Sequence, residues 1–304
     1  MTQHGTACSV CNHVIPRGRP AFAGYGEDDT GLIVGACCGS RLKELATPIY
    51  VGTDLDLKIE DGQKLWRYMD FAKFTALLAQ RGLYFPIASS FEDPFEGAAG
   101  LERRRADWDR FYLNFFKEAV RTVPGGDVET SIGNEVIERE ATRLLGDLSR
   151  AALEARTRLV SCWHANDGES EALWRLYSPP NTIGVAVQTT VDALWNVLAN
   201  HPSGVVGRVH YLDYSQTYAS LNDRIFFKRK SLSHEREVRA VLPNRRENPV
   251  QGQLVTCDLE RLIRYVVSSP FSPSWFTDVL RETISRYGFN LPVQTSELLD
   301  QPFF

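Results

Sequence analysis

The segment at 231–243, "SLSHEREVRAVLP", alternates apolar and charged residues and predicts a strand over 234–242. Side chains change sides at every residue of a strand, so each face carries one kind of residue. Glu235, Glu237 and Arg239 form a charged row on one face. The other face is apolar and is expected to pack on a core: Val238, Ala240 and Leu242. We expect the charged row to face a cleft rather than bulk water.

The same kinds of pattern predict the other elements along the chain. Asp70 is placed to cap the helix that follows the first strand, and this helix is expected to stop at Gly82. Helices are predicted at 71–81, 101–122, 133–157, 170–178, 191–200 and 273–287. Strands are predicted at 64–70, 83–88, 158–164, 182–188, 205–214, 234–242, 252–259, 263–269 and 291–296.

Many of these strands adjoin without a helix between them, which favours an α+β fold with a mixed, largely antiparallel sheet over a doubly wound one. The chain contains no G-x-G-x-x-G and no Walker loop, so neither a Rossmann nor a P-loop nucleotide site is expected. We predict a small cysteine-rich module at 1–45 followed by an α+β domain of catalytic type at 46–304.

Composition and charge exclude some classes of function but do not identify one. The chain has 304 residues, of which 43% are hydrophobic, and a formal net charge of -4. Such a chain is not a generic nucleic-acid binder, and any contact with nucleic acid must come from a local patch. No apolar run is long enough to cross a membrane, and the N-terminus has no apolar signal segment, so a cytoplasmic location is expected. The sequence leaves the oligomeric state open.

Four of the six cysteines lie near the N-terminus. Cys8 and Cys11 form a C-x-x-C knuckle, and Cys37 and Cys38 are adjacent. Four thiolates, or three with a histidine, satisfy the tetrahedral preference of zinc, which would also supply folding energy to so small a segment. Adjacent cysteines chelate one ion awkwardly, so one of Cys37 and Cys38 is expected to be dispensable; the alternative ligands are His4 and His13. Four unrelated reduced thiols are the other interpretation.

Several longer segments, taken in order, resemble a widespread bacterial family catalogued as domain of unknown function 2971. The resemblance covers about residues 64–298 and leaves the cysteine-rich segment outside. The segments that carry it are "LWRYMDFAKFTALLAQRGLYFPIASSFEDPFEG", "SCWHANDGESEALWRLYSPPNTIGVAV", "FFKRKSLSHEREVRAVL" and "RYVVSSPFSPSWF" with "LPVQTSEL".

A second resemblance rests on shorter motifs. Arg67 lies in "LWRYM", Ser161 in "VSCWH", and Glu235 and Glu237 in "HEREVRAVL". In this order they are similar to the Arg, Ser and Glu-x-Glu signals of ADP-ribosyltransferases of the Arg–Ser–Glu type. The match departs from that family where its Ser-Thr-Ser becomes Ser161-Cys162-Trp163.

This resemblance implies a site that cleaves the nicotinamide–ribose bond of NAD through an oxocarbenium-like ribose. Glu237 would stabilise the positive charge, and Glu235 would bind or deprotonate the acceptor. Residues expected to bind the cofactor are Arg67, Ser161, Trp163, Trp174, Tyr177 and Arg239. The implied function is NAD-dependent ADP-ribosyl transfer to a nucleic acid or protein, or NAD hydrolysis, and such folds often serve as toxins or phage-defence effectors.

Each of these residues also has a structural interpretation. The charged row can be an exposed ion row of little energetic value. Arg67 can pair with Asp70, and Ser161 can be a satisfied strand hydroxyl. Trp174 and Tyr177 fall three residues apart on a predicted helix, which is typical of core packing.

Two rival functions remain. Glu92, Asp93 and Glu96 lie in an acidic loop that could bind Mg²⁺ in a metal-dependent nuclease, although a loop in which Asp93 caps backbone donors is the simpler interpretation. The segment at 224–236 is locally basic and could contact phosphates, or it could be a solvated strand edge. The second rival is a non-catalytic binding module, in which the zinc segment and this basic segment contact a partner.

Overall fold

The structure of the protein is a computed structural model. It describes residues 6–15, 21–25, 31–35, 37–38, 47–48, 57, 59–121, 133–179, 182–201, 203–219, 224–245 and 247–304. His4 and the predicted domain boundary between residues 45 and 46 lie outside the described residues.

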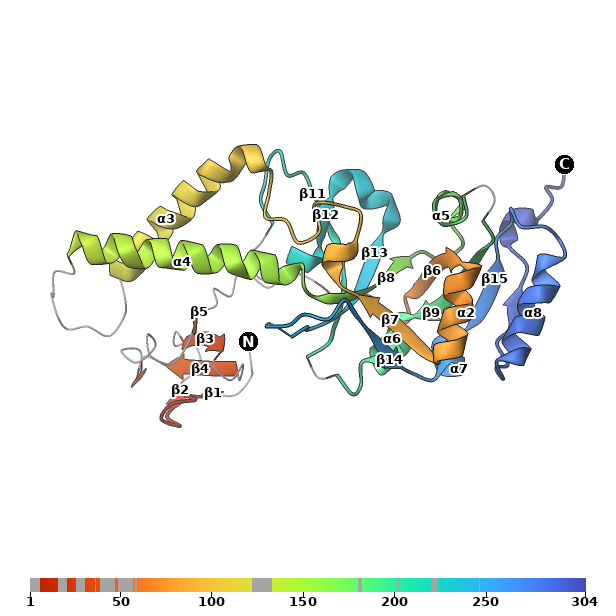
Figure 1. The fold of residues 1–304 in the computed structure, drawn as a ribbon, viewed down its shortest axis with the longest axis horizontal. Coiled ribbons are helices and arrows are strands. Elements are labelled where there is room, and N and C mark those ends of the chain that lie inside the picture. Colours follow the sequence, from red (N-terminus) through yellow and green to blue (C-terminus); the bar gives the residue numbers. More distant parts are fainter. Residues whose placement is uncertain are drawn as a thin grey trace. The chain divides into compact units, whose positions relative to one another are not determined.

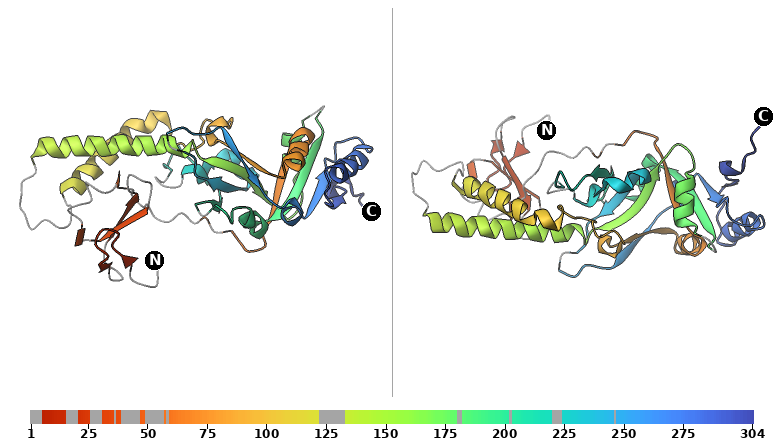
Figure 2. Two further views of the ribbon diagram at one scale, coloured as in Figure 1. Left: turned by 60° about the horizontal axis from the view of Figure 1, so that its bottom comes forward. Right: turned by 90° about the horizontal axis from the view of Figure 1, so that it is seen from above.

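The chain divides into two compact units, and each is described by itself. The first comprises Met1–Leu55, Ala99–Ala152 and Tyr218–Asp223, and the second comprises Asp56–Ala98, Leu153–Thr217 and Arg224–Phe304. Helix α3 (Arg105–Arg121) and most of α4 (Asn134–Ala155) belong to the first unit, although they fall within the α+β domain predicted at 46–304. These helices lie side by side (Figure 2) and are joined by the Lys117–Glu138 ion pair at 2.5 Å.

The second unit is built on a seven-stranded sheet with the order β10-β13-β8-β6-β9-β15-β16 (Figure 1). Every neighbouring pair is antiparallel except β15–β16, which confirms the predicted mixed, largely antiparallel sheet. The strands are β6 (Lys64–Asp70), β8 (Leu159–Ala165), β9 (Gly184–Thr190), β10 (Val205–Arg208), β13 (Glu237–Leu242), β15 (Tyr265–Ser268) and β16 (Val293–Gln294).

Short pairs and helices complete this unit. Strand β7 (Gly82–Pro86) pairs with β14 (Gly252–Thr256), and β11 (His210–Leu212) pairs with β12 (Phe227–Arg229). The α-helices are α2 (Phe71–Gln80), α5 (Glu171–Tyr177), α6 (Val191–Val197), α7 (Leu259–Leu262) and α8 (Phe276–Arg286).

The turn from β6 into α2 follows from local chemistry. The Asp70 side chain accepts a hydrogen bond from the Lys73 backbone N–H, so the predicted cap is confirmed. The helix ends slightly earlier than predicted, because Arg81 takes the left-handed conformation with φ 51°. Gly82 opens β7 instead, where a Cβ atom would lie 2.4 Å from the Val255 carbonyl oxygen.

The two faces of the sheet carry different cores. One face joins the main core, which includes Leu65, Val187 and Val238, and is covered by apolar residues of α2, α6 and α8. The other face carries a smaller cluster in which Trp66 and Tyr68 pack against Trp174 of α5. Figure 1 shows α2 and α5 beside β6. Side chains on opposite faces of the sheet are therefore kept apart, and only those on the same face can come into contact.

The first unit combines small sheets with a helical pair. Strands β3 and β4 form a hairpin extended by β5, and β1 pairs with β2. Its elements are β1 (Thr6–Ala7), β2 (Val14–Ile15), β3 (Ala21–Tyr25), β4 (Gly31–Gly35), β5 (Thr47–Pro48), α3 (Arg105–Arg121) and α4 (Asn134–Ala155). No helix within the described part of the chain is long and apolar enough to span a bilayer.

Candidate functional site

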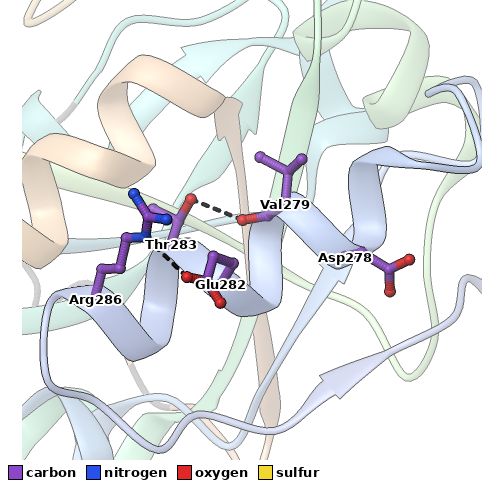
Figure 3. Close-up of a pocket in the computed structure, with 5 residues that line it drawn as sticks. All are labelled: Asp278, Val279, Glu282, Thr283 and Arg286. Carbon is purple, nitrogen blue, oxygen red and sulfur yellow. Dashed lines mark hydrogen bonds and ion pairs between the residues drawn. The ribbon is translucent and has the colours of Figure 1, made fainter.

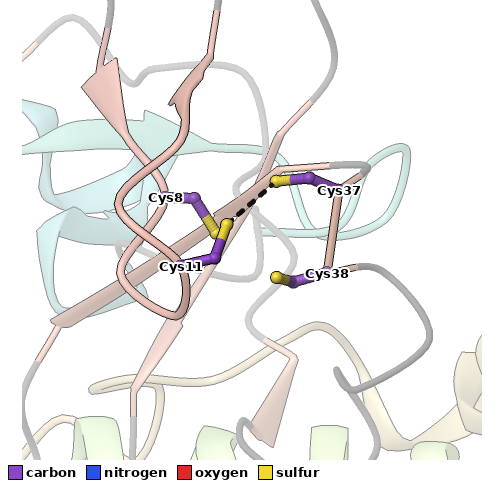
Figure 4. A group of neighbouring side chains, drawn as sticks. All are labelled: Cys8, Cys11, Cys37 and Cys38. Atoms are coloured by element: carbon purple, nitrogen blue, oxygen red, sulfur yellow. Dashed lines mark hydrogen bonds between the residues drawn. The ribbon is translucent and has the colours of Figure 1, made fainter.

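The four N-terminal cysteines form one cluster (Figure 4). Their sulfur atoms all lie within 4.8 Å of one another. Cys8 and Cys11 belong to the turn between β1 and β2, and Cys37 and Cys38 follow β4. The predicted meeting of the two pairs is confirmed, and both Cys37 and Cys38 take part. His13 is exposed and is not a member of the cluster.

Backbone hydrogen bonds explain why the pairs meet. The Cys8 N–H donates to the His13 carbonyl, and Asn12 closes the turn with a positive φ of 56°. The Ser9 N–H then donates to the Ile33 carbonyl at 2.8 Å, and the Ile33 N–H donates to Ser9 Oγ at 2.9 Å. These two bonds fix the cysteine knuckle beside β4, whose end carries the second pair.

The cluster has two buried and two exposed members. Cys8 and Cys38 pack with Ile15 and Val34 in a small core, whereas the side chains of Cys11 and Cys37 are exposed. Hydrogen bonding with Cys11, burial and the nearby Cys8 raise the pKa of the Cys38 thiol to about 12. The pKa of Cys37 is raised in the same way. A metal ion would replace these protons as the partner of the sulfurs.

The strand that carries the charged row begins later than predicted. Strand β13 begins at Glu237, and Glu235 ends the 3-10 helix Lys230–Glu235. Arg236 between them has a φ of 44°, in the left-handed region. The side chains of Glu235 and Glu237 nevertheless converge, because both accept hydrogen bonds from Lys228 Nζ, at 2.5 and 3.0 Å.

The row is part of a buried ion cluster rather than the wall of an open cleft, so this expectation is wrong. Arg239 is fully buried and donates two hydrogen bonds of 2.7 Å to Glu96. Its Nε also donates to Glu237 at 2.8 Å, and it contacts the Ile225 carbonyl. We call Glu96, Lys228, Glu235, Glu237 and Arg239 the ion cluster. Arg239 is therefore a buried counter-ion and not a residue poised for a cofactor.

The pKa values of Glu235 and Glu237 are shifted in opposite directions. Burial alone would raise the pKa of Glu237, but the charges of Arg239 and Lys228 hold it far below its ordinary value. Burial raises the pKa of Glu235, against the opposing effect of Lys228. One carboxyl is thus held ionised while its neighbour binds a proton more readily than usual.

Arg67 and Ser161 do not lie with Glu237. Strands β6, β8 and β13 are neighbours, as predicted, but Ser161 is opposite Ala240 in the register and shares its face. Arg67 donates a hydrogen bond to Ser161 Oγ at 3.2 Å on the side of the main core. Glu237 projects from the other face, opposite His164. The Arg–Ser–Glu arrangement implied by the resemblance is not assembled.

The predicted aromatic residues divide in the same way. Trp163 lies in the main core and donates to Ser161 Oγ, with Arg67 over its ring at 5.7 Å. Trp174 is fully buried in the smaller core, so its structural interpretation holds. Only Tyr177 is partly exposed on the face that carries Glu237. Asp70 pairs with Lys73 and not with Arg67.

Sequence reasoning missed His164, a neighbour of the ion cluster, and Tyr68, whose ring lies beside that of His164. The Nδ1–H of His164 donates to the Glu235 carbonyl oxygen at 2.8 Å, and burial lowers the pKa of His164. Its ring lies 6.0 Å from that of Tyr68 and 5.7 Å from that of Tyr177. The Tyr68 and Tyr177 rings are close to parallel, at 17°. The alternation of side chains along β6 could have revealed Tyr68, because it places Tyr68 on the face opposite to that of Arg67.

The acidic loop does not form a metal site for a nuclease. Glu96 belongs to the ion cluster, and Asp93 pairs with Arg229 at 2.9 Å. Among the described residues, the cysteines are the only group of three or more His, Cys, Asp or Glu side chains placed to hold one metal ion. Lys228 and Arg229 are thereby committed to ion pairs, whereas Lys230 and Arg236 of the predicted basic segment are exposed.

Two shallow surface hollows lie away from these groups. One is on the exposed side of α8 (Figure 3), where its lining includes Val279, Glu282 and Arg286. The lining of the other includes His201, Gly204 and Leu242. Neither contains a member of the ion cluster. Comparison with protein-family models, curated proteins and solved structures finds no match to this chain.

Proposed function

We propose that the four-cysteine cluster binds one zinc ion and that this centre is structural, as part of a zinc-containing binding module. The observation that carries the proposal is the convergence of four sulfur atoms within 4.8 Å. Zinc in structural sites takes four tetrahedral ligands at Zn–S distances of about 2.3 Å, so four thiolates leave no open position for a substrate. The site therefore fits a role in folding rather than in catalysis.

Metal analysis tests this proposal. Protein produced without an affinity tag should contain about one zinc per chain, as one tetrahedral site requires. Cys8→Ser should lose most of the zinc, because it removes a buried ligand. Cys257→Ser is the matched control, since Cys257 lies in the second unit, and it should retain the metal. A wild-type protein that is folded at its N-terminus and free of metal would contradict the proposal.

We propose as a second candidate that the second unit cleaves NAD, by hydrolysis or ADP-ribosyl transfer to a nucleic acid or protein. Its support is the pair Glu235 and Glu237, which meet at one ammonium group but have pKa values displaced in opposite directions. Paired carboxyls displaced in this way suit separate acid–base and charge-stabilising roles. Tyr177 supplies a partly exposed ring 5.7 Å from that of His164, which bonds to the Glu235 carbonyl. Arg67 and Ser161 have no part in this form of the proposal.

Nicotinamide release from NAD tests the second candidate, and Glu235→Gln is the sharper variant. Loss of a general acid–base group should lower activity on the order of 10²–10⁴-fold. The melting temperature should change little, because Lys228 keeps its ion pair with Glu237. Glu282→Gln, on the exposed side of α8, is the matched control and should keep full activity. No release by the wild type, or unchanged release by Glu235→Gln, would overturn the assignment.

Glu237→Gln is a less informative variant than Glu235→Gln. Glu237 is 3% exposed and is bound by Arg239 and Lys228. Removing its charge leaves two buried cations with less compensation, so stability and activity should fall together.

A further inference from the structure

The cysteine cluster is asymmetric in a way that zinc binding alone does not require. Cys8 is fully buried and Cys38 is 8% exposed, and both pack against Ile15 and Val34. Cys11 and Cys37 are exposed, and their sulfur atoms are in hydrogen-bond contact at 3.6 Å. The two thiols that a solvent-borne oxidant can reach are thus also neighbours. They come from segments 26 residues apart in the chain.

We propose that Cys11 and Cys37 are the site of a reversible disulfide formed by hydrogen peroxide, and that its formation releases the zinc. The release of zinc rests on the proposed zinc centre, whereas the formation of the Cys11–Cys37 disulfide does not. It adds an oxidative modification site to a centre that would otherwise be purely structural.

The chemistry balances with peroxide as the oxidant. One of the two sulfurs, as thiolate, attacks the peroxide O–O bond and becomes a sulfenic acid, while the other oxygen leaves and is protonated to water. The second sulfur then attacks the sulfenic sulfur, forming the S–S bond and expelling hydroxide, which is protonated to a second water. Two thiols and one peroxide thereby give one disulfide and two waters.

The required movement is small. A disulfide has an S–S distance of about 2.05 Å, so the sulfurs must approach by about 1.5 Å from their present separation. Cys11 lies in a turn and Cys37 in a short 3-10 segment after β4, so neither residue is held in a strand ladder. Oxidation leaves Cys8 and Cys38 as the remaining sulfur ligands, and two thiolates do not complete the tetrahedral set that zinc prefers.

The other pairings are disfavoured by burial. Cys8 and Cys38 are shielded by the small core, so peroxide reaches them less readily than the exposed pair. Cys162 and Cys257 belong to the second unit and are not members of the cluster.

The experiment treats the full-length protein with hydrogen peroxide and follows zinc release with a chromogenic chelator and disulfides by peptide mass spectrometry. We expect a Cys11–Cys37 cross-link, about one zinc released per disulfide, and reversal by dithiothreitol with added zinc. Cys37→Ser should abolish the cross-link, and Cys257→Ser should not affect it. A predominant Cys8–Cys11 or Cys37–Cys38 pair, over-oxidation without a disulfide, or retention of zinc in the cross-linked protein would overturn the inference.

Zinc content measured before oxidation distinguishes failure of the disulfide proposal from failure of the zinc-centre proposal. Protein that lacks zinc but still forms the Cys11–Cys37 cross-link would disprove the zinc centre and support the pairing. Protein that holds one zinc but forms a different disulfide would support the zinc centre and disprove the pairing.

Discussion

Removal of zinc by a chelator is expected to unfold the β1–β4 region while the seven-stranded sheet stays intact. The buried hydrophobic core around the cysteines is small, and two of its members, Cys8 and Cys38, are proposed ligands of the zinc. In the proposed zinc module, so small a segment draws its folding free energy from metal binding. Hydrogen exchange should show this directly at the amides of Ser9 and Ile33, which hold the knuckle to β4.

After chelation these two amides should lose their protection and exchange at rates typical of an unfolded peptide. Amides of β8 and β13, in the second unit, are the internal control and should keep their protection. Re-addition of zinc should restore the original pattern. Unchanged protection of Ser9 and Ile33 in metal-free protein would mean that the cysteines are ordinary thiols of a self-sufficient fold.

Replacement of Arg239 by alanine is expected to be the most damaging single change in the second unit. Its guanidinium is fully buried between Glu96 and Glu237, and the substitution leaves their negative charges facing each other with only Lys228 nearby. Removing one partner of a buried ion pair destabilises a protein by about 3–5 kcal/mol. For a unit of this size that corresponds to a fall in melting temperature of about 6–20 °C.

Arg281→Ala is the matched control for this experiment. Arg281 also pairs with a carboxylate, Asp278, but its side chain is 52% exposed on α8. An exposed pair of this kind contributes little, so the melting temperature of the control should stay close to that of the wild type. Similar melting temperatures for Arg239→Ala and the wild type would show that the ion cluster is not a stabilising element of the fold.

Local patterns in the sequence were sufficient for most helices and strands between residues 64 and 296 and for the cysteine cluster. Asp70 stands at the end of one alternating run and the start of one helical run, and its side chain caps α2 as predicted. Alternation also placed β8 and most of β13, because a strand with one apolar face needs no information from elsewhere in the chain to show its period. The paired cysteines identified their cluster for a similar reason: a segment too short for its own core carried four metal-type ligands.

The arrangement around Glu237 was decided only in the tertiary structure. Whether Ser161 and Glu237 share a face depends on the register between β8 and β13, and a shift of one residue would exchange the faces. The counter-ion of Arg239 is Glu96, 143 residues away, and no local pattern links the two. Alternation shows that a row of charges exists, but the direction of that row and the charges that neutralise it depend on which strands and loops the fold brings beside it.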